Sequence, residues 1–493
     1  MAVSMEVLQM TQAKAIIGER IDFWQAKSTE PGFNILRGMR KARADILQKL
    51  DEAKLPPHLA PVDATIGDIG PGSIKGELEN DYLHLLGDLY LDPRQTEKHW
   101  EKEIEKQRIR TEYAEKGVYL TSYDSYARGT KESRQLFVQE AKEIGLDAQG
   151  ADNAWLADGG MGSLVRIFRV LNWRYNKDHK KTPKLLAAVP SFTMTLRAAQ
   201  REGFLTDKID VSDLSRNELN SERLHRYFEE VGKDKIPDVF IVTPANNPTA
   251  MSYEPETLRG VINTMLSYNP QVQFVFDMAY MSMIPRDKAR AIMQVLKETG
   301  VDKKSLFAFS ESKVLARPGA RIGAIMTLDL GFKENAANEL EKPLAQSIDD
   351  DTMDSYPGFP GELDVEFQAI RNLVNRNPET LEKYFSLLRQ RQQALLEALR
   401  EVGTDFFENL DQISIPGYEK LRPDAVDQDV PLYLWLKVKP NTNPFEIIKK
   451  LNIVGAPSQA FGMGNGFMRF SVGYSSTNEL LGIAPQTLKR WSR

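Results

Sequence analysis

A lysine, two serines and an arginine lie close together between residues 306 and 323. Lys313 follows the apolar run 306–309, which is typical of a buried strand, and Ser310, Ser312 and Arg321 lie around it. A lysine held at a strand end loses its proton more readily than a solvated one, and the neutral amine can form a Schiff base with an aldehyde. Hydroxyl groups and a guanidinium bind phosphate. An aldehyde and a phosphate on one molecule describe pyridoxal phosphate.

A carboxylate and an amide follow two other apolar runs. Asp277 comes directly after the run 274–276, where burial is costly unless the carboxylate meets a cation or hydrogen-bond donors. A protonated pyridine nitrogen is such a cation, and a helix N-cap explains the residue alone equally well. Asn247 follows the run 239–242 and can donate to a phenolate oxygen or simply form a turn.

Residues 158–163, Asp-Gly-Gly-Met-Gly-Ser, come after the run 154–157 and open an amphipathic helix. Glycines at a helix N-terminus let backbone amides approach an anion, although a tight turn is the commoner reason for them. Phe192 follows the run 185–189, and an aromatic side chain there can stack on a cofactor ring or belong to the core.

These apolar runs alternate with helical segments from about residue 150 to residue 330, which predicts an α/β domain with a parallel-rich sheet covered on both faces. Ligands of such sheets bind beyond the carboxyl ends of the strands, where all the groups above are expected. We also predict helices over 33–54 and about 379–402, and a half-buried strand over 432–438. The mixed charges of residues 92–116 favour a solvated helix.

In their order and spacing, the Asn-Pro-Thr, Asp-x-Ala-Tyr and Ser-x-Ser-Lys…Arg segments resemble the class I/II aminotransferases, the aspartate aminotransferase superfamily of fold-type I enzymes that use pyridoxal phosphate. The resemblance covers roughly residues 60–480. It implies a large domain with a mostly parallel, seven-stranded sheet between helices and a smaller α+β C-terminal domain. The expected boundaries are an N-terminal arm and extension over 1–120, a cofactor-binding domain over 121–370 and a small domain over 371–493.

The resemblance also implies roles for single residues. Lys313 would be the Schiff-base lysine and the proton carrier. Asp277 would pair with the pyridine nitrogen of the cofactor. Asn247 and Tyr280 would hydrogen-bond its phenolate oxygen, and Asn247 would also border the substrate. Arg469, in an apolar strand, would bind the substrate α-carboxylate, although an arginine there could instead pair with a structural carboxylate.

The remaining cofactor contacts implied by the resemblance concern its phosphate and its ring. Phe192 would stack on the ring. The phosphate would be bound by Ser310, Ser312, Arg321 and the backbone amides of Gly160 and Met161. A homodimer with a shared active site is implied as well, with Tyr123 or Tyr126 reaching the phosphate of the neighbouring subunit. The sequence spacing fits either tyrosine.

The chain departs from the family pattern at four positions. Glu311 and Arg317 replace apolar residues, Ala250 replaces the glycine after Asn-Pro-Thr, and Met161 replaces a hydroxyl or small residue. None of these changes removes a catalytic group, so they indicate a divergent subgroup.

The implied activity is an aminotransferase that moves an amino group between an L-amino acid and a 2-oxo acid by a ping-pong aldimine mechanism. A lyase or decarboxylase on the same scaffold, similar to aspartate 4-decarboxylase, is the alternative, because it shares the cofactor contacts. A cofactor-binding regulatory protein is a third possibility. An acidic stretch at 349–354 could face a cationic substrate or be a solvated loop, and the absence of arginine between residues 321 and 371 weakens a dicarboxylate assignment.

Composition excludes several kinds of catalytic site and of binding partner. The chain of 493 residues contains no cysteine, which excludes thiolate catalysis and zinc–sulfur sites. Its five histidines form no HExxH-like pair, so we expect no metal. Its net charge of −5 is spread along the chain and argues against a nucleic-acid partner. The first residues lack a signal-peptide pattern and no apolar run is long enough to span a bilayer, so a cytoplasmic enzyme is expected.

Overall fold

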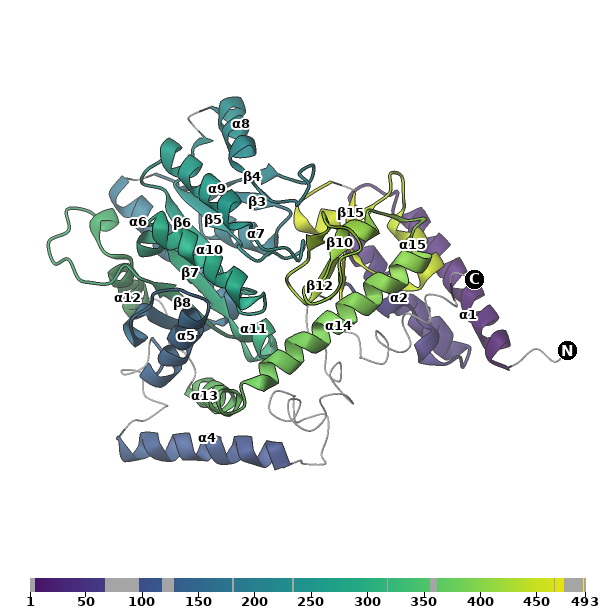
Figure 1. The fold of residues 1–493 in the computed structure, drawn as a ribbon, viewed down its shortest axis with the longest axis horizontal. Coiled ribbons are helices and arrows are strands. Elements are labelled where there is room, and N and C mark those ends of the chain that lie inside the picture. The colour runs from purple at the N-terminus through teal and green to yellow at the C-terminus, as the bar shows by residue number, and fades with distance from the viewer. Residues whose placement is uncertain are drawn as a thin grey trace. The chain divides into compact units, whose positions relative to one another are not determined.

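A computed structural model describes residues 5–66, 97–117, 128–179, 181–232, 235–316, 318–354, 361–464, 466–473 and 491. The chain divides into two compact units. The smaller unit contains residues 1–77, 248–250 and 386–493, and the larger one contains residues 78–247 and 251–385. Figure 1 shows the larger unit mainly in blue to green and the sheet of the smaller one in yellow-green. The domain boundaries at 120/121 and 370/371 stay a prediction.

The larger unit is built on a seven-stranded sheet with the order β2-β8-β7-β6-β5-β3-β4. Its strands are β2 (Ala154–Asp158), β3 (Lys184–Val189), β4 (Leu205–Asp210), β5 (Val239–Val242), β6 (Gln273–Asp277), β7 (Leu306–Ser310) and β8 (Ile322–Thr327). Neighbouring strands from β4 to β7 are parallel, whereas β8 runs antiparallel to β2 and β7. The expected α/β fold with a mostly parallel seven-stranded sheet is therefore confirmed.

The two faces of this sheet bury different side chains because successive residues of a strand point to opposite sides. One face carries mainly aliphatic residues and packs against α6 (Gly159–His179), α7 (Met194–Arg201) and α12 (Leu344–Asp354). The other carries a row of aromatic rings from neighbouring strands: Phe240, Phe274, Phe276 and Phe307. Helices α9 (Pro255–Tyr268) and α10 (Arg286–Glu298) run in front of the strands in Figure 1. Further helices of the unit are α5 (Lys131–Glu143), α8 (Ser221–Val231), α11 (Glu311–Val314) and α13 (Gly361–Arg376).

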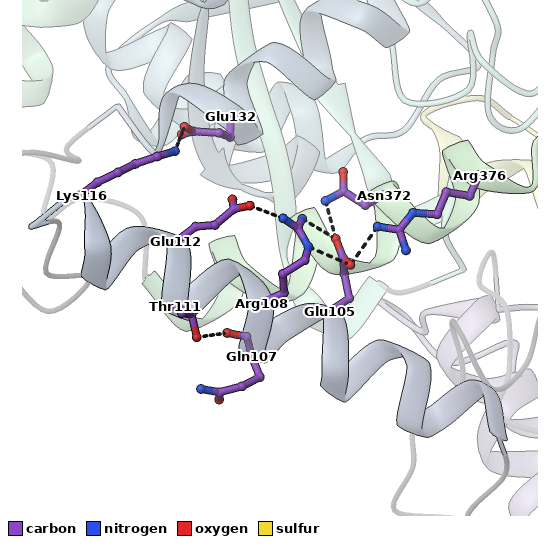
Figure 2. Close-up of polar contacts among 9 residues, drawn as sticks. All are labelled: Glu105, Gln107, Arg108, Thr111, Glu112, Lys116, Glu132, Asn372 and Arg376. Carbon is purple, nitrogen blue, oxygen red and sulfur yellow. Dashed lines mark hydrogen bonds and ion pairs between the residues drawn. The ribbon is translucent and has the colours of Figure 1, made fainter.

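Helix α4 (Glu97–Glu115) contains most of the charged segment, and the expectation of a fully solvated helix was wrong for one of its faces. Ile109 and Tyr113 are buried together with Val365 and Ala369 of α13. Glu105 is also buried. Figure 2 shows its carboxylate between Arg108 of α4 and two residues of α13, and the hydrogen bonds from Asn372 and Arg376 are both 2.9 Å long.

We expect Glu105→Gln to weaken the packing of α4 on α13. The hydrogen bond from Arg108, followed by those from Asn372 and Arg376, lowers the pKa of Glu105 from 4.5 to about 2. Because this pKa is lower in the folded chain, ionised Glu105 stabilises the folded state at pH values above 4.5, its pKa in the unfolded chain. This stabilisation is lost as the pH falls towards 2. The two arginines are partly exposed, so urea unfolding should show a loss of about 1–2 kcal/mol at neutral pH that shrinks on acidification. A difference that does not depend on pH would contradict this interpretation.

The smaller unit contains α1 (Met5–Lys27), α2 (Ile35–Glu52), α15 (Pro444–Leu451) and a four-stranded sheet with the order β14-β15-β12-β9. These strands are β9 (Phe407–Glu408), β12 (Tyr433–Val438), β14 (Ala456–Pro457) and β15 (Phe467–Ser471). Two short parallel pairs join β1 (Val62–Asp63) to β13 (Ile453–Val454) and β10 (Ile413–Ser414) to β11 (Val426–Asp427).

The predicted helix over 33–54 is confirmed as α2, which begins after Asn34, whose side chain accepts a hydrogen bond from the backbone of Arg37 at 2.8 Å. The predicted helix over 379–402 is α14 (Glu379–Val402). The strand predicted over 432–438 is β12. The side expected to face solvent is buried except at Lys437, because Trp435 packs there against Phe461 and Phe467. None of the helices within the described ranges is both long and apolar enough to cross a membrane.

Candidate active site

The expected site residues of the larger unit come together at one edge of its sheet. Strands β2, β3, β5, β6 and β7 all point the same way and end at this edge. Because β8 is antiparallel, it begins there, and Ile322 lies opposite Asp158, the last residue of β2. The turns at this edge carry Gly160, Met161, Phe192, Asn247, Asp277, Tyr280, Ser310, Ser312, Lys313 and Arg321.

A candidate anion cradle lies where β2 meets the start of α6. Nη2 of Arg321 donates to the carbonyl oxygen of Asp158 at 3.0 Å. A Cβ atom added to Gly159 would lie 2.9 Å from the same Nη2, and one added to Gly160 would lie 3.0 Å from Cβ of Ser310. Gly159 also has a φ of +69°, a conformation that glycine adopts without strain. Glycine therefore brings the helix N-terminus, the guanidinium and the Ser310 hydroxyl close together.

The other two residues expected at the phosphate, Ser312 and Met161, differ in the groups that they could offer to it. Ser312 is buried, and its backbone N–H donates to Oγ of Ser310 at 3.3 Å, so that Ser310 caps the short helix α11. Met161 packs its side chain against the aliphatic core beneath the sheet. Because Met161 has no hydroxyl, only its backbone amide at the start of α6 could contact an anion.

Asp277 ends β6 in a buried position. Its Oδ1 accepts one hydrogen bond, 3.2 Å long, from the backbone N–H of Ala279. Burial raises the pKa of Asp277 from 3.8 to about 6, and the Ala279 N–H opposes this only in part. Tyr280 is buried in the turn that follows. A buried carboxyl group with this raised pKa is suited to receive a cationic partner.

The turn after β5 is fastened to the turn after β3. Nδ2 of Asn246 donates to the carbonyl oxygen of Pro190 at 2.9 Å, and its Oδ1 is buried without a hydrogen-bond partner among the described residues. Sequence reasoning missed Asn246 because the family pattern points to its neighbour Asn247, which is buried. Phe192 is 39% exposed in the adjacent turn. Ala250 has a φ of +60°, a conformation that glycine adopts without strain.

Lys313 lies in the single-turn helix α11 directly after β7. The hydroxyl of Tyr384, from the first turns of α14, donates to the carbonyl oxygen of Lys313 at 3.2 Å. Ala316 and Arg321, which follow, both have a φ of +53°, an unfavourable conformation for residues other than glycine. A helix distant in the chain thus reaches the lysine turn through this hydrogen bond, which the sequence did not predict.

Arg469 belongs to the smaller unit and is buried in β15. Its Nη2 donates to the carbonyl oxygen of Thr65 at 2.7 Å, and its guanidinium lies over the rings of Tyr433 and Phe461. The aromatic faces hold the guanidinium plane in a fixed orientation. Tyr123, Tyr126 and Arg317 lie outside the described residues.

Residues 349–351 of the acidic stretch lie in α12 and are paired, so they do not form a solvated loop. Asp349 binds Arg128 and the indole N–H of Trp155, the latter at 2.8 Å. Asp350 pairs with Lys342 at 2.9 Å, and Asp351 pairs with Arg169 at 2.7 Å. These carboxylates therefore fasten α12 to its surroundings.

Comparison with known proteins identifies the family. The sequence profile of "Aminotransferase class I and II" matches residues 177–480, which is more than half of the chain. It includes Asn247, Asp277, Lys313, Arg321 and Arg469, whereas Gly160 and Met161 precede it. No curated protein sequence matches the chain.

Solved structures of aminotransferases share the fold. Aspartate aminotransferase from Thermus thermophilus with maleate has a TM-score of 0.60 and 14% identity, over 95% of this chain and 98% of that one. An aminotransferase from Mycobacterium tuberculosis has a TM-score of 0.62 and 14% identity, over 94% and 97%. The aromatic aminotransferase from Pyrococcus horikoshii OT3 has a TM-score of 0.60 and 16% identity, over 87% and 94%.

The profile match, together with the fold, shows that the chain belongs to the class I and II aminotransferases, the fold-type I transaminases that use pyridoxal phosphate.

Proposed function

We propose that this aminotransferase moves an amino group between an L-amino acid and a 2-oxo acid, with Lys313 as the residue that both binds the cofactor and carries the proton. The observation that supports this most strongly is the convergence of Lys313, Asp277 and the Arg321–Gly159 cradle at one edge of the sheet. A primary amine, a carboxylate and an anion cradle match the aldehyde, the ring nitrogen and the phosphate of pyridoxal phosphate.

The residues present fit that cofactor on two observations. Asp277 is a buried carboxyl group whose pKa is raised to about 6, and a protonated pyridine nitrogen would supply the missing cation. In the cradle of Gly159, Gly160, Ser310 and Arg321, a Cβ atom on either glycine would crowd Arg321 or Ser310, so glycine lets the backbone approach these two side chains. A dianionic phosphate there would receive backbone N–H groups, the helix dipole and a guanidinium.

When bound, pyridoxal phosphate supplies an aldehyde that can pass from Lys313 to the substrate amine and a ring that accepts the electron pair released at Cα. Nζ of Lys313, once released from the aldehyde, would act as the base that removes the proton from the substrate Cα. The same Nζ would hold this proton and deliver it on the cofactor side. Asp277 would pair with the ring nitrogen and favour its protonated form, and Asn247 and Tyr280 would hydrogen-bond the phenolate oxygen.

Arg469 is the proposed partner of the substrate α-carboxylate. Its planar guanidinium can donate two parallel hydrogen bonds to a carboxylate, and this geometry fixes the Cα–H bond in one direction. We further propose a homodimer in which Tyr123 or Tyr126 of one subunit contacts the cofactor phosphate of the other. Substituting each tyrosine with phenylalanine and measuring cofactor affinity will distinguish the two, because only one change should weaken binding.

Arg321→Ala should weaken the binding of pyridoxal phosphate by roughly 10- to 100-fold, because a charge-assisted hydrogen bond contributes about 1.5–3 kcal/mol. The affinity of Arg321→Lys for pyridoxal phosphate should lie between those of the original protein and Arg321→Ala, because lysine keeps the charge and loses the fork geometry. Titration with pyridoxal, which lacks the phosphate, is the matched control and should give the same affinity for all three proteins. Equal losses for both ligands would mean that Arg321 acts on the fold and not on the phosphate.

The reaction class is tested by the visible spectrum of the holoenzyme during additions of single amino acids. A transaminase converts the lysine-bound form to an amine form of the cofactor, and a 2-oxo acid restores the starting spectrum. Turnover of the amino acid with no such conversion would instead assign the protein to the lyases or decarboxylases. A spectrum that no amino acid changes would contradict the proposed function.

A further inference from the structure

A buried series of polar contacts runs through α11, α13 and α5. Oε1 of Glu311 accepts hydrogen bonds from Nε of Arg371, at 2.9 Å, and from Nη2 of Arg371. The same Nη2 donates to Oε2 of Glu140 at 2.5 Å. Oε1 of Glu140 accepts from the hydroxyl of Ser282, also at 2.5 Å. We call these four residues the Glu311–Ser282 network.

Both ends of the Glu311–Ser282 network adjoin residues of the candidate active site. Glu311 comes two residues before Lys313 and starts the single helical turn that carries it. Ser282 comes two residues after Tyr280, in the turn that follows β6. The network therefore joins the lysine turn to the tyrosine turn through side chains of two helices that carry no expected site residue.

Stability alone does not account for this arrangement. Glu311 is 1% exposed, Arg371 6% and Glu140 7%, so two carboxylates and one guanidinium are removed from water together. Burial raises the pKa of Glu311 well above its usual value, and Arg371 opposes this only in part. Oε2 of Glu311 has no hydrogen-bond partner among the described residues. Apolar residues of similar volume are usually at least as stable as a buried ion pair, and the family pattern has one at position 311.

Directional contacts are what the charged residues add. Arg371 contacts Glu311 through two nitrogens and also reaches Glu140, so its guanidinium fixes the relative position of α11 and α5 more tightly than apolar packing does. A shift of about 1 Å in a catalytic group can cost on the order of 100-fold in rate. A lysine that must reach two carbon atoms in turn is sensitive to such shifts.

We propose that the Glu311–Ser282 network is a positioning device that holds the Lys313 turn in register with the Tyr280 turn. This inference rests on the proposed role of Lys313. The four residues act through Lys313 and Tyr280, and none of them touches the substrate.

The first test compares Glu311→Leu with Glu311→Gln. Leucine is the kind of residue that the family has at this position, so the variant should fold, but it removes the acceptor of Arg371. Glutamine keeps an acceptor oxygen of the same shape. We expect Glu311→Leu to lower kcat by about 10-fold with little change in KM, and Glu311→Gln to retain kcat within about twofold. The pH midpoint of the lysine-bound cofactor absorbance should move in the leucine variant and stay in place in the glutamine variant.

The second test is a double-mutant cycle between the two ends of the network. Ser282→Ala alone should lower kcat a few-fold. If the network acts as a unit, adding it to Glu311→Leu should cause no further loss, because the connection is already broken. Two effects that multiply, or a leucine variant with unchanged kcat and absorbance midpoint, would overturn the proposal.

Arg376→Met is the matched control, because it removes an arginine–glutamate pair that the same helix forms with α4 and not with α11 or α5. Arg376 pairs with Glu105 at 2.9 Å. This variant should lower the melting temperature and leave kcat and the absorbance midpoint unchanged. Lys313→Ala separates the two claims. If it keeps activity, the proposed function fails; if it loses activity while Glu311→Leu matches the original protein in both readouts, only the network fails.

Discussion

Lys313→Ala will lower the rate of amino transfer by about 1000-fold or more, because it removes both the covalent attachment of the cofactor and the proton carrier. Single-turnover kinetics with a saturating amino acid measure this loss, since they follow the proton transfer directly. The variant should still bind pyridoxal phosphate through Asp277 and the Arg321 cradle. Its spectrum should then be that of the unattached aldehyde.

Lys304→Ala is the matched control for that experiment. Lys304 is exposed and precedes β7, so it lies at the opposite end of the same strand from Lys313. This variant should keep the rate and the spectrum of the original protein. A Lys313→Ala protein that retains the rate, or a Lys304→Ala protein that loses it, would contradict the assignment.

Asp277→Asn will make the cofactor-free protein more stable and the enzyme nearly inactive. In the folded chain burial keeps the carboxyl group protonated up to about pH 6, whereas the unfolded chain releases the proton near 3.8. Between these values the folded state binds more protons, so the free energy of unfolding falls as the pH rises. Above pH 6 the ionised carboxylate costs the folded state about 3 kcal/mol, and asparagine avoids this cost.

Urea unfolding of the cofactor-free proteins at several pH values measures this difference. The stability gain of Asp277→Asn should be largest at alkaline pH and vanish in acid, where aspartic acid is itself neutral. The catalytic activity of the holoenzyme, in contrast, should decrease in this variant. Asparagine cannot keep the pyridine nitrogen protonated, so kcat should fall by about 100- to 1000-fold. An equally stable variant with normal turnover would show that Asp277 has no cationic partner.

The sequence predicted the central strands well because burial on both faces leaves near-continuous apolar runs. It missed β4, whose residues include Thr206, Asp207 and Lys208. This strand lies at the edge of the sheet, where charged side chains are favoured and the apolar signal disappears. Helix α4 shows the opposite error. Its charges suggested full solvation, but Glu105 is buried by partners from α13, more than 260 residues later in the chain.

Site residues at strand ends were predictable because topology brings those ends to one edge. The position of Arg321 could not be predicted from strand ends alone, because Arg321 precedes β8. Only the antiparallel direction of β8 places its start beside the end of β2. Side chains that hold the site from a distance gave no local signal. Tyr384 looked like one position of an apolar helix face, and Glu311 looked like a departure from the family pattern. Its partner Arg371 lies 60 residues later, and only the fold pairs them.

Borohydride reduction of the holoenzyme, followed by peptide mass spectrometry, tests the central claim most directly, because reduction makes the bond between lysine and cofactor permanent. We expect the pyridoxyl group on the peptide that contains Lys313, with none on the peptide that contains Lys304. Label on another lysine, or no label in a protein that is active with added pyridoxal phosphate, would contradict the assignment of Lys313 and the mechanism built on it.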